Sequence, residues 1–152
     1  MGRGMLPYLY GVIRTIFRHN ILKVHFSIDG GGVEERELLL IAVANGLYLG
    51  GVIRVAPMAR LDDGLLDVIL VKPLSRLAIC KLLPAFITGK YIQKTDVVTH
   101  IRCKRIDIAA PGLYLQMDGL VVQVDEASMS VSPDQQLLLI PDQLLSKAAI
   151  GP

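Results

Sequence analysis

The sequence predicts an α+β domain of mainly antiparallel β-structure, a sandwich or an irregular barrel, with an N-terminal helix and one helical crossover. Three observations support this fold class. Hydrophobic residues form 52% of the 152 residues and charged residues 20%, so a single domain over residues 1–152 can bury a core. Short apolar segments with a two-residue period recur between turn residues. Two segments, residues 6–18 and 74–91, have helical spacing instead.

The first expected element is a helix over residues 6–18, LPYLYGVIRTIFR. Apolar residues gather on one face of this helix, whereas Arg14 and Arg18 share another face at a spacing of four. The apolar face is expected to cover the core. The alternative is that the two arginines contact an anionic membrane surface.

Strands are expected from residue 22, because apolar and polar residues alternate through 22–28, LKVHFSI. Glycines in DGGG, residues 29–32, predict a turn, since glycine accepts positive φ at little cost. A longer strand over 35–45 is expected to pass from half-exposed to fully buried. Further strands are expected over residues 51–55, 66–71, 97–102, 104–109, 113–117, 120–124 and 136–140. The later turn signals are PG at 111–112, DG at 118–119 and SPD at 132–134.

The helical crossover is expected within residues 74–91, LSRLAICKLLPAFITGKY. Ser75 can cap the start of this helix, because its hydroxyl can accept a hydrogen bond from a free backbone N–H. Pro84 should kink or end the helix, and Gly89 marks its stop.

Composition and spacing argue against several classes of protein. The most apolar region, residues 38–53, is interrupted by Asn45 and three glycines, whereas a spanning helix needs about 20 predominantly apolar residues. A net charge of +2 is too small to indicate nucleic-acid binding. Cys80 and Cys103 form no CxxC, and the three histidines, His100 among them, are predicted to be satisfied surface or core residues rather than metal ligands. No signal peptide is visible, so a cytoplasmic protein is expected.

The stretch APMARLDDGLLDVILV, residues 56–71, places Asp62, Asp63 and Asp67 within six residues. A carboxylate beside backbone carbonyls in a tight loop makes an oxygen site suited to Mg²⁺. The alternative is an Asp-Gly turn closed by an Asx hydrogen bond, with a second, solvated aspartate. Spacing alone favours the turn. A second Asp-Gly pair, in LYLQMDGLVVQV, residues 113–124, is typical of a two-residue hairpin turn.

Taken in order, these segments resemble a known family. The segments are LLIAVANGLYLGGVIRVAPMARLDDGLLDVILV, a following helix, GKY, IRCKRIDI, MDG and VSPDQQLLLIP. They resemble the C-terminal domain of the diacylglycerol kinase catalytic family, which includes bacterial soluble lipid kinases and is related to sphingosine and ceramide kinases. The resemblance runs over residues 6–141, nearly the whole chain.

This resemblance implies one half of a two-domain lipid kinase. The family's N-terminal domain carries a GGDGT nucleotide loop, which this chain lacks, so ATP would be bound mainly by that absent domain. The C-terminal domain is expected to contribute a Mg²⁺ site and part of the lipid pocket. The implied partners are a lipid substrate, the N-terminal kinase domain and a membrane surface touched peripherally. Self-association through the surface left uncovered is also expected.

The resemblance also assigns roles in the RLDDGL loop. Asp63 would bind Mg²⁺ through its side chain, while Arg60 and Leu65 would contribute backbone carbonyls. Asp62 would be the turn residue or would contact the metal's ligands rather than the metal.

One position departs from the family pattern, in which the second Asp-Gly pair is followed by a glutamate, the proposed general base. Here the triplet is Asp118, Gly119 and Leu120, and leucine cannot accept a proton. Glu126 lies six residues on, about 20 Å along an extended strand, and is a poor substitute. Either the parent enzyme uses another base, or this homologue is catalytically weakened, or the alignment shifts here.

The expected function is therefore ATP-dependent phosphorylation of a diacylglycerol-like lipid hydroxyl, within lipid metabolism and phospholipid biosynthesis. The 152-residue chain alone is expected to be inactive. One alternative is a β-domain that binds a lipid or a protein and catalyses nothing, which Leu120 favours and the intact LDDGLLD loop disfavours. A third class is the structural half of a sugar- or nucleotide-kinase relative.

Overall fold

The computed structural model describes residues 21–49, 53–117 and 120–132. Its elements, in chain order, are β1 (Leu22–Ile28), β2 (Glu34–Leu38), β3 (Leu40–Ala44), β4 (Leu66–Val71), α2 (Arg76–Thr88), the 3-10 helix η1 (Lys90–Gln93), β5 (Val98–Cys103), β6 (Arg105–Met117) and β7 (Leu120–Ser130). The predicted helix over 6–18 and the predicted strand over 136–140 lie outside the described residues.

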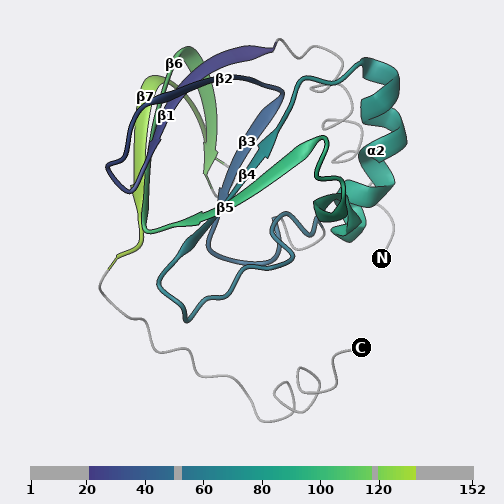
Figure 1. The fold of residues 1–152 in the computed structure, drawn as a ribbon, viewed down its shortest axis with the longest axis horizontal. Helices are drawn as coiled ribbons and strands as arrows, with labels where there is room; N and C mark the ends of the chain where they lie inside the picture. Colours follow the sequence, from purple (N-terminus) through teal and green to yellow (C-terminus); the bar gives the residue numbers. More distant parts are fainter. Residues whose placement is uncertain (1–20, 50–52, 118–119, 133–152) are drawn as a thin grey trace.

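The strands form two open antiparallel sheets. One sheet has four strands in the order β2-β1-β6-β7, and the other has three in the order β3-β4-β5. Figure 1 shows the four-stranded sheet, the three-stranded sheet and α2 as successive layers. This confirms the predicted α+β class with mainly antiparallel strands. Because neither sheet closes, the arrangement is a sandwich rather than a barrel.

The middle strand of the smaller sheet, β4, explains why the layers hold together. All six of its residues, LDVILV, are buried. Since successive side chains point to opposite faces, Val68 and Leu70 join the core between the two sheets, whereas Ile69 and Val71 join a second cluster with residues of α2 and η1. The sheet therefore has one apolar core on each side.

One predicted strand is wrong, because the chain changes sheet within it. Residues 35–45 form β2, which pairs with β1, and β3, which pairs with β4. The change occurs at Leu39, whose N–H donates to the carbonyl of Val71 at 2.8 Å. Leu38 packs between the sheets and Leu39 packs on the other cluster. Residues 38–44, LLLIAVA, are a continuous apolar run, which suits one long strand as well as two short ones. The sequence pattern therefore gave no sign of the break.

In the larger sheet, by contrast, two predicted strands form a single strand. Segments 104–109 and 113–117, expected as two strands, form the single strand β6 with an irregularity between Ala109 and Leu113. Gly112 has a φ of 67°, and its N–H donates to Asp125 Oδ1 at 2.9 Å, so this glycine belongs to a bulge rather than a chain reversal. Strand β7 also extends to Ser130 instead of ending at residue 124.

In the described part of residues 51–55 the structure has only an isolated bridge, between Leu49 and Ile53. The predicted strand there is not formed in that part. The segment instead runs as a loop from β3 towards β4. This loop carries the first pair of aspartates.

The predicted helix is confirmed at both ends. Ser75 accepts a hydrogen bond from the N–H of Ala78 at 3.3 Å, and Gly89 ends the helix in the left-handed region with a φ of 77°. The helix continues through Pro84 to Thr88, so the proline does not end it. No helix in the described ranges is long and apolar enough to cross a membrane.

Tyr91 of η1 ties the helical layer to the loop before β4. Its side chain is fully buried, and its ring stacks on Phe86 with centroids 4.4 Å apart. The hydroxyl donates to the backbone carbonyl of Val55. Burial, and then the negative charge of Asp67, raises the pKa of Tyr91 to about 12.

Tyr91 is therefore expected to make the protein sensitive to alkali. Above about pH 10 the unfolded chain loses the tyrosine proton while the folded chain keeps it, so stability present below that pH is lost between about pH 10 and 12. The raised pKa corresponds to about 2–3 kcal/mol of unfolding free energy. Denaturant midpoints of wild type and Tyr91→Phe at about pH 9 and 11.5 would measure this. The variant should lose less stability than wild type over this interval, and equal losses would contradict the assignment.

Candidate functional site

The loop before β4 closes as an Asx turn. Asp63 Oδ1 accepts a hydrogen bond from the N–H of Leu65 at 3.0 Å. Between them Gly64 has a φ of 68°, a left-handed conformation that favours glycine. The alternative of an Asx turn with a second, solvated aspartate is therefore present. Asp63 closes the turn with a side chain that is 18% exposed, and Asp62 is the solvated aspartate, with a side chain that is 74% exposed.

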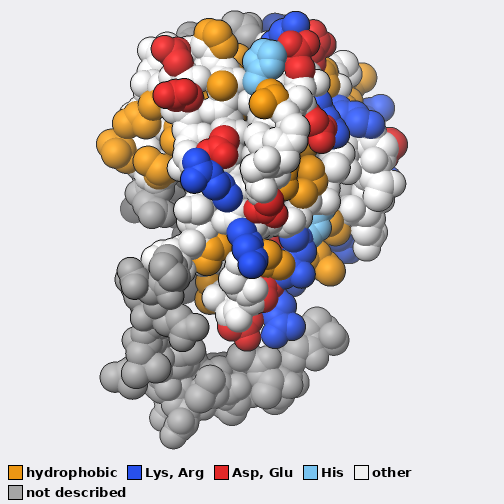
Figure 2. All heavy atoms as spheres, turned by 60° about the vertical axis from the view of Figure 1, so that its left-hand side comes forward, with side chains coloured by type: hydrophobic (Ala, Val, Ile, Leu, Met, Phe, Trp, Pro, Cys, Tyr) orange, Lys and Arg blue, Asp and Glu red, His pale blue; other side chains and the backbone are white. Residues whose placement is uncertain are grey.

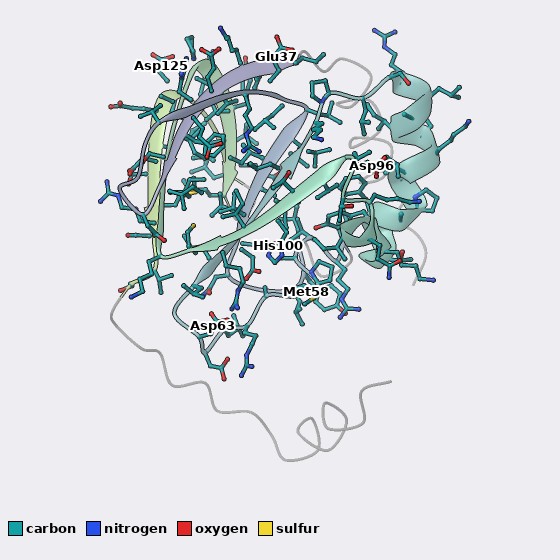
Figure 3. The ribbon with its side chains drawn as sticks, viewed as in Figure 1. Glu37, Met58, Asp63, Asp96, His100 and Asp125 are labelled. Carbon is teal, nitrogen blue, oxygen red and sulfur yellow. The ribbon has the colours of Figure 1, made fainter. Side chains whose placement is uncertain are left out.

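The other oxygen of Asp63 is bound by an arginine from a distant part of the chain. Arg102 Nη2, on β5, donates to Asp63 Oδ2. Arg102 Nε also lies 3.9 Å from Asp67 Oδ1. Residues 67 and 102 are register partners in the β4–β5 pair, which places the guanidinium beside both carboxylates. Figure 3 shows Asp63 in the loop beneath the three-stranded sheet, below His100.

Asp67 is the one charged residue that is fully buried in the described part of the chain, with an exposure of 0%. Its Oδ1 lies 2.6 Å from His100 Nε2. Its Oδ2 is also buried and has no hydrogen-bond partner among the described residues. The prediction that His100 is a satisfied histidine agrees with this contact. The pair itself was not predicted, because 33 residues separate its members.

The first aspartate of the loop, Asp62, is exposed to solvent, unlike Asp63 and Asp67. Asp62 lies at the surface, and Arg60 donates to its two oxygens at 3.3 and 3.4 Å. The Arg60 guanidinium lowers the pKa of the Asp62 carboxyl, and Asp62 in turn raises the pKa of Arg60. Exposed pairs of this kind contribute little to stability. The two adjacent aspartates therefore have separate roles, one on the surface and one in the turn.

Arg102 disfavours a divalent cation at Asp63 in this loop as it is arranged. Both oxygens of Asp63 accept from donors, and one donor is itself a cation. Within the described ranges, no three His, Cys, Asp or Glu side chains lie together as metal ligands. Mg²⁺ at Asp63 Oδ2 would have to share this oxygen with the Arg102 guanidinium, and the two positive charges would repel each other. The assignment of Asp63 with the carbonyls of Arg60 and Leu65 stays a prediction from the resemblance.

The second predicted position, Leu120, begins β7 and pairs with Met117 of β6. Its side chain is 61% exposed. Asp118 and Gly119 lie outside the described residues. Tyr114, Met117 and Val121 are also exposed on these two strands, so apolar side chains face solvent at this end of the hairpin. The expected self-association remains a prediction.

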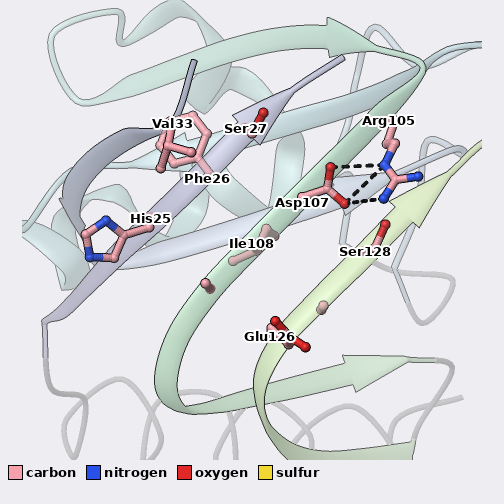
Figure 4. Close-up of a pocket in the computed structure, with 11 residues that line it drawn as sticks. His25, Phe26, Ser27, Val33, Arg105, Asp107, Ile108, Glu126 and Ser128 are labelled. Carbon is pink, nitrogen blue, oxygen red and sulfur yellow. Dashed lines mark hydrogen bonds and ion pairs between the residues drawn. The ribbon is translucent and has the colours of Figure 1, made fainter. Parts of the chain in front are cut away.

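A separate hollow of about 480 Å³ lies on β1, β6 and β7 (Figure 4). Arg105 and Asp107, two residues apart on β6, line it and pair with each other at 2.8–3.1 Å, and His25, Glu126 and Ser128 also line it. It contains none of the predicted site residues. Figure 2, turned towards the four-stranded sheet, shows acidic and basic side chains interspersed on this face, without a field of one sign.

Two stacked, open antiparallel sheets with a helical layer define a β-sandwich-like domain. Residues 1–140 match the family described as the YegS C-terminal NAD kinase beta sandwich-like domain, and the chain belongs to this family. The resemblance to the C-terminal domain of the diacylglycerol kinase family is thereby confirmed.

Similar proteins support the same relation. The chain is 26% identical over 138 residues to proteins named diacylglycerol kinase from two strains of Mycobacterium tuberculosis, CDC 1551 / Oshkosh and H37Rv. The match covers 91% of this chain and 44% of each relative. A candidate diacylglycerol kinase of solved structure, from Bacillus anthracis str. Sterne, is 27% identical with a TM-score of 0.55. That match covers 83% of this chain and 43% of the other, so this chain spans less than half the length of these relatives.

Proposed function

We propose that this chain is the C-terminal half of an ATP-dependent lipid kinase that phosphorylates a diacylglycerol-like hydroxyl. The observation that carries the proposal is the family match over residues 1–140, joined to relatives that bear the name diacylglycerol kinase. Those relatives are more than twice as long as the matched segment, which agrees with a partner half that carries the remaining parts of the reaction.

In this proposal the other half binds ATP, since no glycine-rich nucleotide loop occurs in the 152 residues. Mg²⁺ would offset charge on the ATP phosphates during transfer. This chain would present the ordered Asp63 loop and the β6–β7 hairpin to the lipid. Contact with the membrane would be peripheral, and the protein would reside in the cytoplasm. The 152-residue chain alone would transfer no phosphate.

A second candidate is a non-catalytic domain that binds a lipid or a protein. Leu120 favours it, because an exposed leucine at the family's base position cannot take a proton from a hydroxyl. Its register partner Met117 is also exposed, as are Tyr114 and Val121 on the same two strands, and these side chains are suited to apolar contact rather than to proton transfer.

The two candidates are separated by a phosphotransfer assay on the full-length gene product. Labelled ATP and MgCl₂ would be supplied with vesicles that contain diacylglycerol, sphingosine or ceramide. Label in the diacylglycerol product is expected if the chain is part of a kinase. Vesicle binding without label in any lipid would support the non-catalytic candidate instead.

The loop makes a further prediction for this assay. Asp63→Asn should lower activity by roughly tenfold, because it weakens two hydrogen bonds, one of them to a cation, that order the turn. Asp62→Asn is the matched control, since the Asp62 side chain is 74% exposed and pairs with the exposed Arg60. Its activity should stay near that of wild type. Equal losses in the two variants would count against a special role for Asp63.

A further inference from the structure

We infer that Arg102 is the cation that holds the Asp63 loop in place, so that the order of this loop does not depend on a bound divalent metal. The inference goes beyond the proposed function and does not depend on phosphoryl transfer. The loop before β4 and the start of that strand are acidic, since Asp62, Asp63 and Asp67 lie within six residues. Neighbouring carboxylates repel one another, and positive charge placed beside them offsets this repulsion.

Each of these carboxylates has a cationic or cation-forming neighbour within the described structure. Asp62 pairs with Arg60 at the surface, and Asp67 contacts His100 in the interior. Asp63 pairs with Arg102, which also approaches Asp67. Arg102 is therefore the one side chain in the described ranges that contacts two of the three carboxylates.

The chemistry of the guanidinium suits this position. Arginine stays charged at all ordinary pH values and presents five donors in a planar fork, so its Nη2 and Nε can face different carboxylates. The Arg102 side chain is 40% exposed and that of Asp63 is 18% exposed. The pair is therefore partly shielded from solvent, where a hydrogen bond between charged groups contributes more than on an open surface.

The geometry shows how Arg102 would order the loop. Asp63 uses Oδ2 for Arg102 and Oδ1 for the N–H of Leu65, the residue directly before β4. With Oδ2 held, the carboxylate is oriented so that Oδ1 faces this N–H. Arg102 is thus a positioning residue that acts on the Asx turn through Asp63.

Hydrogen–deuterium exchange of the Leu65 amide in the full-length protein tests this inference directly. Arg102→Gln should speed this exchange roughly tenfold, since the turn then opens more often. In wild type the exchange rate should be the same in millimolar MgCl₂ and in EDTA. Arg102→Lys keeps the charge without the planar fork, and should give an intermediate rate.

Arg105→Gln is the matched control, because Arg105 also pairs with an aspartate but lies on β6 in the other sheet. It should leave exchange at Leu65 unchanged. Should Arg102→Gln fail to fold, Arg102→Lys carries the test, and a rate equal to wild type would overturn the inference. An unchanged rate in Arg102→Gln would overturn it too. So would a tenfold slowing of wild-type exchange by MgCl₂, since a metal would then hold the loop.

Discussion

His100→Leu is expected to lower the free energy of unfolding by about 3 kcal/mol, because it leaves a buried carboxylate without its hydrogen-bond partner. Asp67 is fully buried, one of its oxygens already lacks a partner in the described structure, and Arg102 is 3.9 Å from the other. Urea or guanidinium denaturation of the full-length protein would measure the loss as a shift of the midpoint.

The control for this prediction is the double variant Asp67→Leu with His100→Leu. Replacing both members of a buried polar pair by apolar side chains is often nearly neutral, whereas removing one member is costly. The double variant should therefore recover most of the lost stability. If His100→Leu instead costs less than about 1 kcal/mol, Asp67 is stabilised by something other than this histidine.

Leu120→Glu is expected to raise the turnover of the full-length enzyme at least tenfold, if position 120 is where the family places its base. A general base typically contributes about 10²–10⁴-fold in rate. Leu120 is the first residue of β7, and its exposed side chain leaves room for a carboxylate. Stability should change by no more than about 0.5 kcal/mol, as is usual for surface substitutions. Initial rates at saturating ATP and lipid would measure the gain.

Val121→Glu serves as the matched control for Leu120→Glu. Val121 is 60% exposed, so it resembles Leu120 in solvent contact. Neighbouring residues of a strand point to opposite faces of the sheet, so this variant adds the same charge on the wrong side. It should give no gain in turnover. An unchanged rate in Leu120→Glu, in a parent that is already fully active, would place the base elsewhere.

The elements that the sequence predicted well are those whose signals are local. Strands β1 (Leu22–Ile28) and β4 (Leu66–Val71) have the bounds expected from apolar patterning and turn residues. Ser75 and Gly89 bound α2 as expected, since a hydroxyl cap and a left-handed residue act within one helical turn. The two-residue period likewise sufficed to predict mainly antiparallel strands.

The sequence by itself thus determined the fold class, the positions of most elements, the family and the tight turn at Asp63. The tertiary structure alone decided that the chain changes sheet at Leu39, and that Asp67 meets His100 while Arg102 meets Asp63. These contacts follow from the register of β4 against β5, which joins residues more than thirty positions apart. Strand register depends on packing across both cores, so no local pattern of residues could have shown which carboxylate each cation would reach.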